Sequence, residues 1–183
     1  FLPNSIADIT FTDLGHEATF DDLSPITRTN QNDVTMADYD KVTEQSKDNP
    51  VFYVQYANAR VNSVLRRARD AGVAVDDATL AAADLTHLGH EAELTMAKKI
   101  AEWPRLVEIA ARNNEPHRVA FYLYELASDL HGLWNRGNDD ASLRFVQEDA
   151  GVTQAKIALA RAVSVVISAG LGILGVTPVE EMR

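Results

Sequence analysis

The fold is decided by the stretch DNPVFYVQYANARVNSVLRRARD, residues 48–70. Asp48 suits the cap of a helix, and Pro50 stands where a proline in the first helical turn is tolerated. Apolar residues then recur every three or four positions, which is the spacing of one face of an α-helix. They are Val54, Ala57, Val61, Val64, Leu65 and Ala68. The stretch therefore predicts a long amphipathic helix that ends near residues 70–72.

Further helices are predicted downstream of this first one. We expect them within residues 78–85, over 90–102 and 106–112, from Glu115 and Pro116 onward, and over about 153–168. Residues 137–140 are expected to form a turn, and the glycines at 170, 172 and 175 to loosen the end of the last helix. The four or five longer helices among these, amphipathic and joined by short connections, predict an all-α fold, a helical bundle.

The N-terminal region differs in composition and hydrophobic periodicity from the rest of the chain. Residues 1–47 are rich in Asp, Thr and Asn and show only weak periodicity. We expect a short strand within residues 6–13, a short helix within 33–45, and otherwise an extended arm. The predicted organisation is thus an N-terminal arm, residues 1–47, and a helical bundle, residues 48–183.

Composition narrows the function classes. The net charge is −10, which is the wrong sign for a generic nucleic-acid binder, so any RNA contact must come from a local basic face. The chain has no cysteine, which excludes disulfides and thiolate metal sites. The longest apolar stretch, residues 158–176, is interrupted by Arg161 and several glycines, so we expect no membrane span.

The histidines and serines give no catalytic or metal site. His87 and His90 are three positions apart, but no third ligand is near them in sequence, so a structural or solvated role is expected. No serine stands in the glycine-bracketed turn of a hydrolase, and no glycine-rich phosphate loop follows a strand. We therefore expect no cofactor, no metal and no catalytic residue in this chain.

The arginines of the first helix are the best functional candidates. Arg60, Arg66 and Arg67 are close enough to form a small basic strip, and guanidinium groups suit phosphates. Tyr53 and Tyr56 are placed to stack on an unpaired base. The alternative is that Arg66, Arg67 and Arg69 only pair with neighbouring acids on a solvated face.

Three separated blocks, in the right order, resemble the C-terminal helical, anticodon-binding (DALR-type) domain of bacterial class I arginyl-tRNA synthetases, without the catalytic domain. The first block is DNPVFYVQYANAR at 48–60, preceded by VTEQSK at 42–47. The second is EPHR at 115–118, with YLYELA at 122–127, His131 and Trp134-Asn135. The third runs from ALARAV at 158–163 through GLGILGV at 170–176 to EEMR at 180–183.

The resemblance implies a function and a site. In the family this domain grips the anticodon arm of tRNA-Arg, while a separate Rossmann-type domain activates arginine with ATP. By likeness, the face bearing Tyr56 and Arg60, together with Met182, would approach the anticodon loop. The RNA-binding residues expected in all are Tyr53, Tyr56, Arg60, Arg66, Arg67 and Met182.

The sequence also departs from the family pattern. The family usually has His at the position of Asn58, residues 27–40 match only loosely, and no match is found before Gly15. The family's catalytic motifs are absent, and HLGH at 87–90 lacks the strand and nucleotide fold of an ATP site. This chain alone is therefore expected to be non-catalytic, although the full-length family is an arginine–tRNA ligase.

Two hypotheses follow, with a third reading beside them. The first is a cytoplasmic tRNA-binding module whose partner is tRNA-Arg. The alternative is a repurposed, synthetase-derived structural subunit of a larger protein assembly, such as one in the mitochondrial matrix, which the charge and the loosely matching arm favour. The third is that the chain is one piece of a full synthetase.

Overall fold

The computed structural model describes residues 11–13, 16–18 and 49–182, and the chain divides into two compact units, residues 1–44 and 45–183. In the first unit, β1 (Phe11–Asp13) and β2 (His16–Ala18) form an antiparallel pair in which Phe11 lies opposite Ala18. The strand expected within residues 6–13 is confirmed for its last three residues. Residues 6–10 and the helix expected within 33–45 lie outside the described residues.

The first helix of the second unit is α3 (Pro50–Asp70). Its N-cap is Asn49, whose side chain accepts hydrogen bonds from the backbone N–H groups of Val51 and Phe52, so the expected cap at Asp48 was wrong by one residue. Gly72 ends the helix in a left-handed conformation, with φ of 84°. The Val73 N–H donates to the Ala68 carbonyl at 3.0 Å, which completes a Schellman motif.

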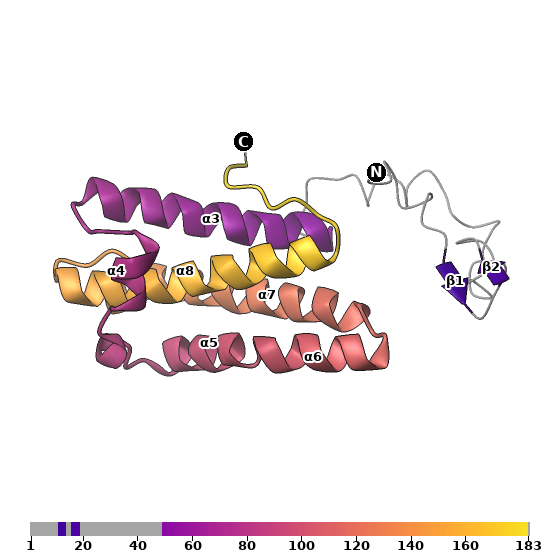
Figure 1. Cartoon of the computed structure of the whole chain (residues 1–183). Helices are drawn as coiled ribbons and strands as arrows, with labels where there is room; N and C mark the ends of the chain where they lie inside the picture. Colours follow the sequence, from indigo (N-terminus) through magenta and orange to yellow (C-terminus); the bar gives the residue numbers. More distant parts are fainter. Residues whose placement is uncertain (1–10, 14–15, 19–48, 183) are drawn as a thin grey trace. The chain divides into compact units, whose positions relative to one another are not determined.

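The remaining elements form the predicted helical bundle (Figure 1). They are α4 (Asp77–Ala81), η2 (Leu85–His87), α5 (Glu91–Ala101), α6 (Trp103–Asn113), α7 (His117–Asp139), η3 (Ala141–Leu143) and α8 (Ala150–Ile173). The expected helix at 78–85 is split into α4 and the short η2. The helix expected at 106–112 begins earlier, at Trp103, because Pro104 occupies its first turn rather than interrupting it.

Two predictions about glycines were wrong. Gly137 lies inside α7 rather than in a turn, and a Cβ there would make only an ordinary contact, 3.4 Å from the Leu143 carbonyl oxygen. Gly170 lies inside α8, where a Cβ would lie 2.7 Å from Leu123 Cδ2, so it serves close helix packing. Only Gly175, with φ of 74°, ends α8 as expected.

Helix α8 forms the centre of the bundle and packs against α3, α4, α5 and α7 (Figure 1). By length and composition it is apolar enough to cross a membrane, contrary to the expectation from its interrupted sequence. However, 56% of its most apolar window is buried inside the bundle. Its buried side chains include Ile157, Val163 and Ile167, which belong to the single hydrophobic core of the described residues.

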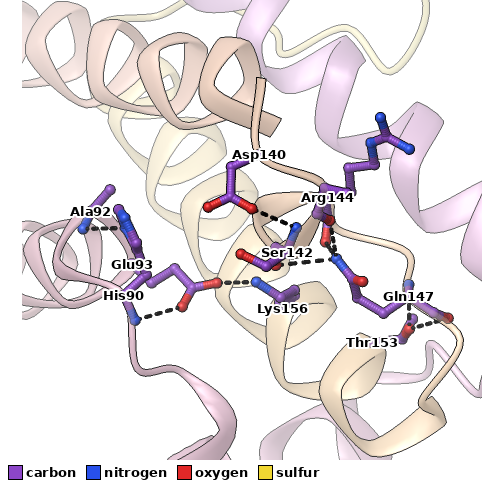
Figure 2. Close-up of polar contacts among 10 residues, drawn as sticks. His90, Ala92, Glu93, Asp140, Ser142, Arg144, Gln147, Thr153 and Lys156 are labelled. Carbon is purple, nitrogen blue, oxygen red and sulfur yellow. Dashed lines mark hydrogen bonds and ion pairs between the residues drawn. The ribbon is translucent and has the colours of Figure 1, made fainter. Parts of the chain in front are cut away.

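A buried ion pair joins α5 to α8 (Figure 2). Lys156 donates to Glu93, and the two side chains are only 5% and 4% exposed. Glu93 also accepts from the backbone N–H of His90, while the His90 Nδ1 accepts from the Ala92 N–H, so His90 and Glu93 form a capping box. His90 therefore has a structural role at the start of α5.

Candidate nucleic-acid interface

A groove of about 420 Å³ lies between α3, α7 and the C-terminal tail. We call it the arginine groove, and its lining residues are Tyr56, Ala59, Arg60, Ser63, Arg66, Arg67, Trp134, Glu181 and Met182. Tyr56, Arg60, Ser63 and Arg67 are spaced by four, three and four positions, which places them on one face of α3. The groove therefore combines cations with aromatic rings, the two side-chain types that bind single-stranded RNA.

Arg60 lies at the centre of this arrangement and is half-buried. Its guanidinium carbon is 4.6 Å from the centre of the Tyr56 ring and 5.0 Å from that of Trp134. Its Nη1 lies 3.1 Å from Nδ1 of His131. Because arginine only donates hydrogen bonds, His131 Nδ1 must be the acceptor, and the imidazole is neutral with its proton on Nε2.

The surroundings of His131 favour its neutral form. Burial of the ring, which is 6% exposed, lowers the pKa of His131, and the positive charge of Arg60 lowers it further. The centre of the His131 ring also lies 5.5 Å from that of the Tyr56 ring, so His131 contacts both Arg60 and Tyr56. Arg60 is thus held in place by neutral groups, and its charge is left uncompensated by any of these contacts.

The other two predicted arginines differ in their contacts. Arg66 Nη1 lies 3.3 Å from Glu181 Oε1, but both side chains are about half exposed, so this pair is weak and easily exchanged for another anion. Within the described part of the chain, neither Arg67 nor Arg69 lies in an ion pair. The alternative of acid-paired arginines thus applies to Arg66, and Arg67 presents an unpaired charge to the groove.

The C-terminal tail is fixed to α3 by two buried amide side chains. Gln55 donates from Nε2 to the Thr177 carbonyl at 2.8 Å and accepts from the Val179 N–H at 2.8 Å. Asn58 donates to the Val179 carbonyl at 2.9 Å, and its Oδ1 accepts from Ser164 Oγ at 2.8 Å. This clamp holds the tail so that Glu181 and Met182 reach the groove.

The comparisons with known proteins identify the family of this chain. The family model described as the DALR anticodon binding domain matches residues 54–182. The chain belongs to this family. It is 69% identical over 176 residues to the arginine–tRNA ligase of Cereibacter sphaeroides, covering 96% of this chain and 30% of that protein. The corresponding enzyme of Ruegeria pomeroyi is 70% identical over 157 residues, with coverages of 85% and 27%.

The structural likeness points the same way. The arginyl-tRNA synthetase of Thermus thermophilus matches with a TM-score of 0.64 and 26% identity, over 79% of this chain and 23% of that one. A structure described as a putative arginyl-tRNA synthetase from Campylobacter jejuni has the same TM-score at 21% identity, which supports the fold alone. The chain therefore spans about 30% or less of the length of these relatives.

One sequence interpretation needs correction in light of these relatives. The C. sphaeroides match covers 96% of the chain, so it must include part of the segment before Gly15, where no match was expected. The loosely matching arm was an argument for a repurposed subunit, and that argument loses its basis. Asn58 stands where the resemblance to the family implied His, and its amide group binds both Ser164 and the tail.

The structure brings five of the six predicted RNA-binding residues of this DALR-type domain into one groove. Tyr53 is the exception: it is half-buried, with its ring 5.1 Å from Tyr124 and 4.7 Å from His131. Sequence reasoning did not assign Trp134 or His131 to the site. The two are three positions apart on α7, a spacing that places both on one face of that helix, but sequence alone does not indicate that this face packs against α3.

The described residues show no metal centre. No group of three His, Asp or Glu residues among them is arranged to hold a metal ion. His87 is exposed, and His90 accepts the capping hydrogen bond described above.

Proposed function

We propose that this chain binds the anticodon arm of tRNA-Arg through the arginine groove and does not catalyse aminoacylation on its own. The observation that carries the proposal is Arg60, a cation fixed between two aromatic rings and a neutral histidine in a groove that also contains Arg67. Stacking rings and uncompensated cations bind unpaired bases and their phosphates. Membership of the anticodon-binding domain family supports the anticodon arm as the part of the tRNA that is bound.

A fluorescence titration of the 183-residue chain with tRNA-Arg and with an unrelated tRNA tests this proposal. Arg60→Ala should weaken tRNA-Arg binding by about tenfold or more, because a charge-assisted contact is worth roughly 1.5–3 kcal/mol. Arg112→Ala is the control, since Arg112 is exposed on α6 and pairs with Glu108. Equal affinity for both tRNAs, with no loss on Arg60→Ala, would refute the proposal.

The remaining parts of the proposal concern partners and place. The relatives reported above are bacterial enzymes, so we assign the chain to a bacterial cytoplasm, and the mitochondrial alternative has no support among them. We assign residues 1–47 to the end of the region that precedes the anticodon-binding domain in such enzymes. We also propose that α8 is a core helix rather than a membrane span, because it packs against four other helices.

A repurposed structural subunit is the competing function. None of the relatives reported above carries a name of that kind, and the DALR family match supports RNA binding instead. Size-exclusion chromatography of the native chain separates the two. A complex with tRNA supports the proposal, whereas a stable multiprotein complex without RNA supports the competing function.

A further inference from the structure

A second hollow adjoins the arginine groove. Its volume is about 350 Å³, and Arg67 and Trp134 line both hollows, so the two lie next to each other at these side chains. On its far side the second hollow is lined by Arg144, which follows η3, and by Phe145. We call it the Arg144 pocket.

The charge of the Arg144 pocket is unusual for this chain. The sequence carries 27 acidic and 17 basic residues, yet the lining contains two arginines and no acid. Within the described residues neither Arg67 nor Arg144 lies in an ion pair. Figure 2 shows the Arg144 side chain extending away from the Asp140 carboxylate, so the nearby acid does not neutralise it.

The loop that carries Arg144 is held in a defined conformation (Figure 2). Gln147 Nε2 donates to three carbonyls of this loop, those of Ala141, Ser142 and Arg144, at 2.7–3.1 Å. The Ser142 side chain and the Ser142 N–H, which donates to Asp140 Oδ1 at 2.8 Å, both lower the pKa of the Asp140 carboxyl. The loop is therefore preorganised, which lowers the entropy cost of binding a ligand there.

One hydrogen bond orients the guanidinium of Arg144 and leaves its other donors available. Its Nε donates to the Gly137 carbonyl at 3.0 Å, which leaves the four N–H bonds of the two terminal nitrogens for a ligand. The Trp134 and Phe145 rings, 6.0 Å apart, give the pocket an apolar wall. A fixed guanidinium beside a second one suits an anion with several acceptor oxygens, which is the chemistry of a phosphate.

We propose that the Arg144 pocket is a second RNA contact, which binds a backbone phosphodiester of the RNA whose unpaired bases occupy the arginine groove. This inference rests on the proposed function and extends the interface from α3 across Arg67 to the loop after α7. A phosphate contact fixes the position of the RNA without reading its sequence. The contact therefore contributes equally to cognate and unrelated RNA.

The salt dependence of RNA binding tests the proposal on the 183-residue chain. Each phosphate contact contributes about 0.7–0.9 to the slope of log affinity against log salt. Arg144→Ala should lower that slope by this amount for tRNA-Arg and for an unrelated RNA alike. The affinity ratio of wild type to variant should then fall about threefold between 50 and 200 mM salt.

Two variants make the test specific. Arg105→Ala removes the same unit of charge from an exposed position on α6, outside both hollows, and should leave the slope unchanged. Arg144→Lys keeps the charge and should keep the slope while weakening binding, because lysine cannot donate in the same forked geometry. Unchanged thermal unfolding of the three variants confirms that the fold is retained.

The outcomes separate this inference from the function on which it rests. If wild type binds tRNA-Arg selectively but Arg144→Ala behaves as Arg105→Ala does, the pocket assignment is overturned and the function stands. If wild type binds all RNA equally but only Arg144→Ala lowers the slope, the phosphate site stands and the tRNA-Arg assignment falls. Saturable binding of inorganic phosphate that needs Arg144, with no change in RNA slope, would assign the pocket to a free anion and overturn the proposal.

Discussion

The tail clamp gives the sharpest prediction of this structure. Gln55→Glu replaces an amide by a carboxylate of nearly the same shape, so it keeps the acceptor for the Val179 N–H and removes the donor to the Thr177 carbonyl. At neutral pH the carboxylate then faces a carbonyl oxygen at about the 2.8 Å of the original bond, and the side chain is only 8% exposed. We expect the tail to detach from α3 far more often in the variant.

The magnitude follows from the bonds involved. One buried hydrogen bond is lost, worth about 1 kcal/mol net, and the carbonyl left facing a like-charged oxygen adds about 1–2 kcal/mol. The sum of about 2–3 kcal/mol corresponds to a tail that opens roughly 30- to 150-fold more often. Since Glu181 and Met182 follow directly, binding of tRNA-Arg should weaken as well.

Backbone hydrogen exchange measures this opening. The Val179 amide should exchange roughly 30- to 150-fold faster at pH 7, after correction for intrinsic rates, although its acceptor is retained. The Val176 amide is the internal control, because it donates to the Leu171 carbonyl at 2.8 Å, independently of Gln55. Burial should raise the pKa of the introduced carboxyl, so protection should return as pH falls and its proton restores a donor. Unchanged exchange at Val179 would refute the clamp.

Three further predictions concern stability. Gly170→Ala should lower the free energy of unfolding by about 1–3 kcal/mol in thermal unfolding, because the added Cβ would lie 2.7 Å from the buried Leu123 side chain. Gly132→Ala is the control: a Cβ there has nothing within 4 Å, so the free energy of unfolding should rise by up to about 1 kcal/mol. Equal effects of the two substitutions would contradict the packing role of Gly170. Lys156→Met should lower the free energy of unfolding by about 3–5 kcal/mol in denaturant titrations, because it leaves the Glu93 carboxylate buried without its cation. A loss below about 1 kcal/mol would argue against a buried ion pair. Because the pKa of His131 is lowered in the folded chain, the unfolded chain binds a proton at this residue more readily, so the free energy of unfolding should fall as pH drops below about 6.5. His131→Gln should reduce this pH dependence. A pH profile of stability that is the same in wild type and variant would contradict the lowered pKa.

The helices were largely predictable because their apolar spacing is local information. The stripe from Val54 to Ala68 on α3 is buried along its whole length, as the 3.6-residue period requires. Some of the errors fall on glycines, where local rules favour a turn or a helix end but tertiary packing can decide. At Gly170 the missing Cβ makes room for Leu123, which lies on α7 and is distant in sequence, and no local pattern reveals that neighbour.

The site was predictable to the extent that one helix carries it. Tyr56, Arg60 and Arg67 share a face of α3, so their spacing alone brings them together. Met182 was predicted only from the resemblance to the family, because its position in the groove depends on a tail that is fixed by side chains more than 100 positions away. Trp134 required the packing of α7 against α3, which sequence spacing does not give.

The structure explains how an acidic chain can still present usable positive charge. Away from the groove, arginines such as Arg118 and Arg161 lie beside carboxylates, with Glu115 and Asp77 as their partners, and their charge is largely cancelled locally. In the groove the guanidinium of Arg60 is oriented by aromatic rings and a neutral imidazole, which bind it without cancelling its charge. Net charge therefore describes long-range attraction, whereas the neutral partners of an arginine decide whether it can bind a phosphate at short range. An Arg60 paired with a carboxylate would be equally ordered but far less available, and for this reason neutrality of His131 matters to the proposed function.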